Sequence, residues 1–372
     1  MHEKCSLILS NNEVLEGYLI GKPTRASGEM VFTTGMVGYS EAITDPSYFG
    51  QILVFTYPLV GNYGIPSLSE SSPDFIPSGF ESLKAQTKAV VITTDSPESH
   101  HWNSFRTLDQ WLKEQGITGI VGIDTRHLVH QIRSHAQLMG KVVPGVIADQ
   151  NEVREIVSQE PFFDPGSQNI LSKVSTPERR VVGAGKTKIG LIDCGVKWNI
   201  VRQLLENDCE VELIPYDADF DSVDCDAWLL SNGPGNPKNS GDLIASVRKL
   251  LEGDKPILGI CLGHQVLSLA AGAATERMAY GHRGHNQPVF QVGTRKGFIT
   301  SQNHGYVVTN DSLPDDWDVW FLNVNDHTNE GIRHKYKPFR SVQFHPEAAG
   351  GPRDTGWILN NFVKEVRGSQ HA

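Results

Sequence analysis

The hydrophobic and polar positions follow one pattern in the first part of the chain and a different one after residue 187. In the first part, short apolar runs alternate with glycine-containing turns, and the runs at 6–9 and 14–20 predict a β-hairpin. In the second part, apolar strands alternate with helical segments such as 196–206, which is typical of a parallel sheet covered by helices. The predicted strands of this second part lie at 188–193, 210–215, 227–230 and 256–260.

Prolines and glycines interrupt a weak helical pattern between residues 151 and 185. We therefore predict a β-rich mixed domain at 1–150, a linker at 151–185, and an α/β domain with an open, mostly parallel sheet at 186–372. The first domain also contains a predicted helix, 108–115, whose apolar residues share one face. The residues on either side of it suit its ends, because Thr107 can cap the start and Gly116 can end the last turn.

The composition narrows the class of protein. With 372 residues, 39% of them hydrophobic and 20% charged, the chain is long enough for two globular domains. Its formal charge of −10 disfavours nucleic acid or an anionic membrane as a partner. No apolar run approaches the length of a membrane span, and the five scattered cysteines do not form a disulfide framework or a paired zinc motif. We therefore expect a cytoplasmic protein.

One stretch combines a strand, a sharp turn and a helix around a cysteine. The apolar run 256–260 ends at Cys261, which Gly259 and Gly263 bracket, and a helical run follows. This pattern predicts a nucleophile elbow with sulfur in place of a serine oxygen. The glycines are needed because a side chain at either flank would collide with the neighbouring strand or helix. The helix N-terminus would favour a thiolate and an oxyanion. The alternative is a buried structural cysteine in a glycine-rich turn.

A histidine and a carboxylate two residues apart follow a later strand-like run. Pro346 stiffens the step between His345 and Glu347, so both side chains can project from one turn. The imidazole of His345 could then accept the thiol proton of Cys261, while Glu347 fixes the tautomer of the ring and stabilises the imidazolium. These three residues are the predicted catalytic group.

Cys261, His345 and Glu347 together resemble the triad of class I glutamine amidotransferases. The resemblance extends to the Gly-Pro-Gly turn at 233–235 and to the Gln-Asn-His-Gly segment at 302–305. It implies that the cysteine attacks the side-chain amide of glutamine, giving a glutamyl thioester and ammonia. In such enzymes the backbone N–H groups that correspond to Gly233 and Leu262 stabilise the oxyanion.

The first domain is similar to the amino-terminal domain of the small chain of carbamoyl phosphate synthase, for example in the segments 28–41 and 122–126. This family resemblance implies that ammonia passes to a large chain, which makes carbamoyl phosphate from bicarbonate and two ATP for arginine and pyrimidine synthesis. ATP and Mg²⁺ are expected on that large chain, and no cofactor is expected in this one. Heterodimers that associate further are the expected assembly.

The same resemblance implies a set of residues that contact glutamine: Ser47, Gly233, Gly235, Leu262, Gln265, Asn303, Gly305 and Tyr306. Ser47 belongs to the first domain, so the resemblance places the glutamine site at the domain boundary.

Other functions remain open at this point. The chain could be the amidotransferase of another synthase, such as one that makes anthranilate or GMP, or a regulatory subunit without catalysis. A cysteine peptidase would share the elbow but would not need the segment 302–305. His282 and His285 stand three positions apart, but no further ligand is in view, so we predict no metal site.

Overall fold

The computed structural model describes residues 3–67 and 76–369. The chain divides into two compact units, of which the first contains the described residues up to Pro165 except Ile76. Ile76 and the described residues from Gly166 onward form the second. Among the described residues, no helix has the length and hydrophobicity needed to cross a membrane.

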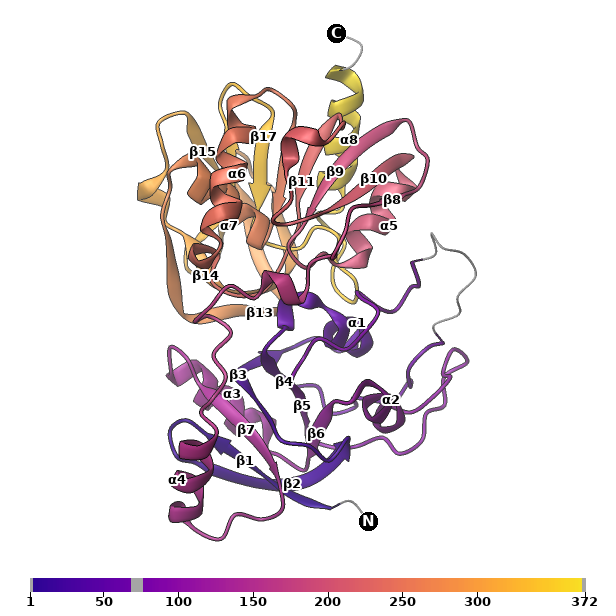
Figure 1. The fold of residues 1–372 in the computed structure, drawn as a ribbon, viewed down its shortest axis with the longest axis vertical. Coiled ribbons are helices and arrows are strands. Elements are labelled where there is room, and N and C mark those ends of the chain that lie inside the picture. Colours follow the sequence, from indigo (N-terminus) through magenta and orange to yellow (C-terminus); the bar gives the residue numbers. More distant parts are fainter. Residues whose placement is uncertain (1–2, 68–75, 370–372) are drawn as a thin grey trace. The chain divides into compact units, whose positions relative to one another are not determined.

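The first unit is built around a closed barrel of strands (Figure 1). The predicted hairpin is confirmed, because β1 (Lys4–Leu9) and β2 (Val14–Gly21) pair in antiparallel register. Around the barrel the strands follow the order β1, β2, β6 (Thr118–Val121), β5 (Ala89–Ile92), β4 (Gln51–Phe55), β3 (Ala26–Thr33) and β7 (Met139–Pro144). The barrel closes where β7 pairs with both β1 and β3. Alternate strand residues such as Leu7, Ile52 and Val54 fill its core.

The helices of the first unit have well-defined starts. The predicted helix is confirmed as α2 (Leu108–Gln115): Thr107 and Gln110 form a capping box, and Gly116 ends the helix in a left-handed conformation. Asp124 caps α3 (Thr125–Ser134) by accepting a hydrogen bond from the N–H of His127. The remaining helical elements are α1 (Tyr39–Thr44), the short η1 (Pro46–Tyr48) and α4 (Gln150–Gln159).

The second unit is an open α/β sheet, as predicted. Its described strands follow the order β14 (Gly297–Val308), β13 (Thr275–Gln291), β15 (Trp317–Asn323), β16 (Asn329–His334), β17 (Phe339–Val342), β12 (Ile257–Ile260), β11 (Ala227–Leu230), β9 (Thr187–Asp193), β10 (Cys209–Pro215) and β8 (Arg180–Val182). Parallel pairing runs from β17 to β10, so the predicted parallel sheet is the centre of a larger mixed one. Antiparallel strands extend it on both sides.

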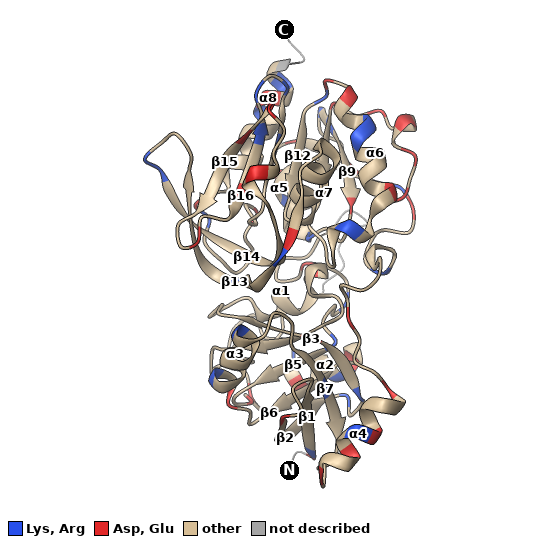
Figure 2. Cartoon of the chain, turned by 90° about the vertical axis from the view of Figure 1, so that its left-hand side faces the viewer, with Lys and Arg blue, Asp and Glu red and all other residues tan. Residues whose placement is uncertain are grey.

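Helices cover both faces of this sheet (Figure 1). Apolar residues of α5 (Trp198–Glu206) and α8 (Trp357–Ser369) pack in one core, and those of α6 (Gly241–Glu252) and α7 (Leu262–Ala271) in another. A sheet covered on both faces explains why β12 is fully buried. Figure 2 shows basic and acidic residues interspersed along α4, α6 and α8. The connections also contain the short helices η2 (Leu171–Lys173), η3 (Phe220–Ser222), η4 (Pro237–Asn239) and η5 (Asn310–Ser312).

The structure differs from the predicted linker at 151–185. Helix α4 belongs to the first unit, where Val153 and Ile156 pack against Ile8 and Val143. At the other end, β8 pairs with β10 and is therefore part of the second sheet. Pro161, Pro165 and Pro177 lie in the connection between these two elements, whereas Gly183 and Gly185 follow β8. A helix can end just before such breakers, and a short edge strand can lie among them.

Candidate active site

The predicted elbow is formed where β12 meets α7. Cys261 lies between them with φ of 54° and ψ of −104°, a strained conformation for a residue that carries a side chain. The flanking glycines are required, as expected. A Cβ atom on Gly263 would lie 2.2 Å from the carbonyl oxygen of Leu230, and one on Gly259 would lie 2.6 Å from the carbonyl oxygen of Gly263. The elbow therefore holds a buried cysteine at the start of a helix and at the carboxyl end of a central strand.

His345 and Glu347 lie on the turn that follows β17. The N–H of His345 donates to the carbonyl oxygen of Ser301 at 3.0 Å, which ties this turn to β14. The Nδ1 atom of His345 lies 2.6 Å from Oε1 of Glu347, and both side chains are buried. Because a carboxylate can only accept, Nδ1 carries the proton of this bond. In the described part of the chain, Nε2 of His345 has no hydrogen-bond partner of good geometry.

The electrostatics of this pair favour an imidazolium beside a carboxylate. Burial alone would lower the pKa of His345, but the negative charges of Glu347 and Cys261 raise it above its usual value. Burial alone would raise the pKa of Glu347, but Lys197 and His345 hold it below its usual value. The ring of His345 is therefore suited to take a proton from Cys261 and to hold it.

Lys197 is a member of the site that sequence reasoning missed. Its Nζ atom lies 3.0 Å from Oε1 of Glu347 and 2.6 Å from the carbonyl oxygen of Ala348, and the residue is only 5% exposed. Asn199 and Gln203 also donate to the carbonyl oxygen of Glu347. Lys197 follows the carboxyl end of β9, where active-site residues of open α/β sheets collect, and that rule could have identified it.

Two backbone N–H groups lie beside the elbow. Gly233 follows the carboxyl end of β11, and Leu262 is the first residue of α7. The two residues are adjacent, since a Cβ atom on Gly233 would lie 2.8 Å from Cδ2 of Leu262. Within the described residues neither N–H donates a hydrogen bond. Gly235, two positions further, has a φ of 93°, which favours glycine. This arrangement suits an oxyanion that forms next to Cys261.

The structure also brings several predicted glutamine contacts together on β14 and α7. Nε2 of Gln265 donates to the carbonyl oxygen of Tyr306 at 2.9 Å, which links the helix to the strand. Asn303 accepts a hydrogen bond from Arg283 through Oδ1, while its buried Nδ2 has no partner among the described residues. A Cβ atom on Gly305 would lie 3.3 Å from the same arginine. Sequence reasoning missed Arg283, although it stands between the two histidines considered as a metal pair.

Each of the two units matches a known protein family. Residues 7–142 match the family "Carbamoyl-phosphate synthase small chain, CPSase domain", and residues 190–365 match "Glutamine amidotransferase class-I". A carbamoyl phosphate synthase arginine-specific small chain from Debaryomyces hansenii is 41% identical over 98% of this chain and 86% of its own length. The chain belongs to the carbamoyl phosphate synthase small chain family.

This small-chain family also includes segments of longer proteins. A protein named "Multifunctional protein CAD", from Squalus acanthias, is 47% identical, and the match covers 97% of this chain but 16% of that protein. A protein named "Carbamoyl-phosphate synthase [ammonia], mitochondrial", from Rattus norvegicus, is 40% identical over 97% of this chain and 24% of its own length. The chain thus spans a minor part of these two relatives. A solved structure of a glutamine amidotransferase from Thermotoga maritima is 18% identical, covering 50% of this chain and 86% of its own, with a TM-score of 0.37.

Ser47 and His285 need a separate description. Ser47 is a buried residue of η1 in the first unit, where its N–H donates to Oδ1 of Asp45 at 2.8 Å. Its contact with glutamine stays a prediction. His285 lies beside Gly351 in the second unit, and burial, followed by the charge of Lys197, lowers the pKa of His285 to about 4. A neutral ring at this position adds no charge next to the predicted catalytic group.

Proposed function

We propose that this chain hydrolyses glutamine to glutamate and ammonia, and that it supplies the ammonia to a large chain that makes carbamoyl phosphate. The observation that carries the proposal is the strained, buried Cys261 at a helix N-terminus together with the buried His345–Glu347 pair, to which it is electrostatically coupled. Family membership supports the same activity.

The chemistry follows from the positions of these groups. Sulfur of Cys261 attacks the amide carbon of glutamine, and its proton goes to Nε2 of His345. The N–H groups of Gly233 and Leu262 stabilise the negative oxygen of the tetrahedral intermediate. When this intermediate collapses, the C–N bond breaks and His345 returns the proton to the departing ammonia. Water then attacks the thioester, with His345 again as the base, and releases glutamate and the thiol.

Glu347 and Lys197 act on His345 rather than on glutamine. Glu347 holds the proton of Nδ1, which leaves Nε2 as the atom that exchanges a proton with sulfur. Lys197 keeps Glu347 ionised in a buried environment, where a lone carboxylate would be costly. Gln265, Asn303, Gly305 and Tyr306, with Ser47 and Gly235, are the groups proposed to hold the amino-acid end of glutamine.

The proposed partner is the large chain that would use the ammonia, and the first unit offers a surface for it. The first unit contains no part of the predicted triad, and several of its large apolar residues are exposed, including Met36, Val37, Trp102 and Phe105. Ring contacts connect the exposed Trp102 through His101 and Tyr63 to the buried Tyr39, so Trp102 is anchored to the body of the first unit. We infer that this surface docks the large chain, which carries the sites for ATP, Mg²⁺ and bicarbonate, and that the resulting heterodimers associate further. A reducing cytoplasm suits the five cysteines, all of them free and buried.

Nitrogen donors other than glutamine fit the site less well. The name of the rat relative specifies ammonia. A chain that served only ammonia-dependent synthesis would have no use for a strained cysteine. This chain has Cys261 in a strained turn, and its His345 and Glu347 side chains are hydrogen-bonded to each other. The match of residues 7–142 favours carbamoyl phosphate synthase over the synthases of anthranilate or GMP.

The substitution Cys261→Ser separates the two half-reactions in the assembled enzyme. Glutamine-dependent synthesis of carbamoyl phosphate should fall by at least about 10³-fold, because the hydroxyl is a much weaker nucleophile. Synthesis from ammonium salts should continue at the wild-type rate, since free ammonia needs no thioester. Cys209→Ser, at another buried cysteine, is the matched control and should preserve both rates. A glutamine-dependent rate that survives Cys261→Ser would refute the proposed function.

A further inference from the structure

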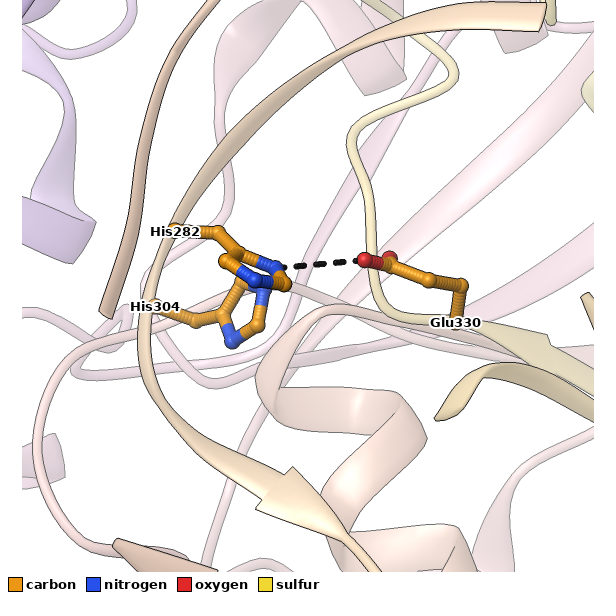
Figure 3. Close-up of side chains that lie close together, drawn as sticks. All are labelled: His282, His304 and Glu330. Atoms are coloured by element: carbon orange, nitrogen blue, oxygen red, sulfur yellow. Dashed lines mark ion pairs between the residues drawn. The ribbon is translucent and has the colours of Figure 1, made fainter. Parts of the chain in front are cut away.

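Two histidines and a glutamate converge in the second unit, outside the proposed triad. His282 on β13 and His304 on β14 are direct partners across the two strands, with ring centroids 5.1 Å apart. Glu330 on β16 points toward them (Figure 3). One ligand atom of each residue lies within 4.8 Å of the other two, and all three side chains are buried. Buried charged groups at such distances require compensation.

The outer nitrogen of each ring has an acceptor. Nε2 of His282 lies 2.8 Å from Oδ2 of Asp326, and Nδ1 of His304 lies 2.8 Å from the carbonyl oxygen of Tyr306. A neutral imidazole has a single N–H, and these acceptors can only receive it. When both rings are neutral, as binding of a metal requires, the inner nitrogens, Nδ1 of His282 and Nε2 of His304, present lone pairs to the cluster. A carboxylate or carbonyl on the outer nitrogen is the usual arrangement for histidines that bind a metal.

The inner atoms of the cluster are mostly electron-pair donors. Oε1 of Gln302 lies 2.9 Å from Nδ1 of His282 and 3.0 Å from Nε2 of His304. Oε1 of Glu330 lies 3.3 Å from Nδ1 of His282, and its buried Oε2 has no partner among the described residues. The Nδ2 group of Asn323 donates to Oε1 of Glu330 at 2.8 Å and lies 3.4 Å from Nδ1 of His282. This single amide does not reach Oε2 of Glu330 or Nε2 of His304, whereas a cation among the inner atoms would.

We propose that His282, His304 and Glu330 bind a divalent transition-metal ion of the zinc class, with Oε1 of Gln302 as the fourth ligand. Imidazole and carboxylate ligands suit Zn²⁺. In a tetrahedron with bonds of about 2.0–2.1 Å, ligand atoms are roughly 3.3 Å apart. The distances of 2.9, 3.0 and 3.3 Å between inner atoms are close to that value.

The proposed ion has a structural role. It joins strands β13, β14 and β16, and two of its ligands flank Asn303, a predicted glutamine contact. With four protein ligands, no coordination position is left for a water molecule, so the proposed site is structural rather than catalytic. The inference does not depend on the proposed function, since it concerns side chains outside the triad.

The test measures metal content and affinity in the full, untagged chain. After removal of metals with a chelator, Zn²⁺ is titrated against a chromophoric competitor, and Co²⁺ is added separately to record the absorption of a tetrahedral site. We expect one ion per chain in the wild type and in Cys261→Ser. Glu330→Gln retains the shape of the side chain but loses its charge, and Asp326→Asn weakens the support of His282. Affinity should fall by about 10- to 100-fold in Asp326→Asn and by at least as much in Glu330→Gln.

His264→Asn is the matched control, because His264 is a buried histidine outside the cluster whose Nδ1 lies 2.8 Å from Oγ of Ser341. It should bind Zn²⁺ as the wild type does. Circular dichroism verifies that each variant is folded. A folded wild type that binds no ion would overturn the proposal, and would mean that Gln302 is rotated to present its NH₂ group to the histidines. Loss of the ion in Cys261→Ser would also overturn it, because the ion would then belong to the triad.

Discussion

The substitution Gly263→Ala tests whether the elbow depends on close backbone packing. Gly263 is the second residue of α7, and its N–H donates to the carbonyl oxygen of Ser231 at 3.0 Å. A Cβ atom here would lie 2.2 Å from the carbonyl oxygen and 2.7 Å from the carbonyl carbon of Leu230. Both are backbone atoms at the end of a central strand, so no flexible side chain can move aside. The start of α7 must therefore shift.

The magnitude follows from three contributions. Overpacking of a buried site costs about 1–3 kcal/mol. Lengthening the hydrogen bond between Gly263 and Ser231 costs about 1 kcal/mol. Alanine in place of glycine returns up to about 1 kcal/mol of helix propensity. The free energy of unfolding should therefore fall by about 2 kcal/mol, which corresponds to a decrease of roughly 4–8 °C in Tm for a unit of this size. Because Cys261 is two residues away, a displacement near 1 Å should also lower kcat by roughly 10²-fold.

Thermal denaturation and glutaminase assays on the same preparation measure both effects. Gly368→Ala is the matched control, since it introduces the same methyl group in helix α8 with nothing within 4 Å. It should leave kcat unchanged and raise stability slightly. A Gly263→Ala protein with wild-type Tm and kcat would show that the elbow tolerates a side chain, and would refute the packing argument.

Three further predictions concern the charges and the partner surface. Glu347→Gln removes a negative charge that raises the pKa of His345, and the imidazolium is lost as pH rises through that pKa. The alkaline limb of kcat/KM should therefore move to lower pH. An unmoved limb would mean that Glu347 does not stabilise the imidazolium. Lys197→Met leaves the buried Glu347 without its cation and should lower the free energy of unfolding, measured with urea, by about 3–5 kcal/mol. Adding Glu347→Gln to Lys197→Met should restore part of this loss. An unchanged free energy of unfolding in Lys197→Met would contradict the pairing. Trp102→Ser should weaken binding of the large chain, measured by calorimetry, at least tenfold. Tyr336→Ser, at an exposed aromatic residue of the second unit, should leave this affinity unchanged. Equal effects of the two substitutions would argue against the proposed docking surface.

The parts of the fold that could be predicted from the sequence are those with local signals. The hairpin β1–β2, helix α2 and the four central strands were identified from apolar runs bounded by glycine or capping residues. Closure of the first barrel could not be predicted in this way, because it depends on pairing of β7 with β1, more than a hundred residues earlier. The same holds for the antiparallel strands β13 to β16, which are partly exposed and carry polar residues that resemble loops.

The residues of the candidate site likewise fall into those with local sequence signals and those without. Cys261 and the His345–Glu347 pair stand in short motifs whose spacing indicates their chemistry. Lys197 has no such motif, and its bond to the carbonyl oxygen of Ala348 spans 151 residues of sequence. The cluster of His282, His304 and Glu330 likewise exists only because three strands meet. Local sequence patterns contain no information on these contacts, so the prediction of no metal ligand followed from spacing alone.

The most direct test of the central claim is to trap the covalent intermediate. The chain is mixed with glutamine, quenched in acid within the first turnovers, and digested for mass spectrometry. We predict a glutamyl group on the peptide that contains Cys261, absent in Cys261→Ser, and accumulating when deacylation is slowed. Cys5, Cys194, Cys209 and Cys225 are buried and free, and should stay unmodified. Ammonia release without any adduct on Cys261, or an adduct on another cysteine, would contradict the assignment of Cys261 as the nucleophile.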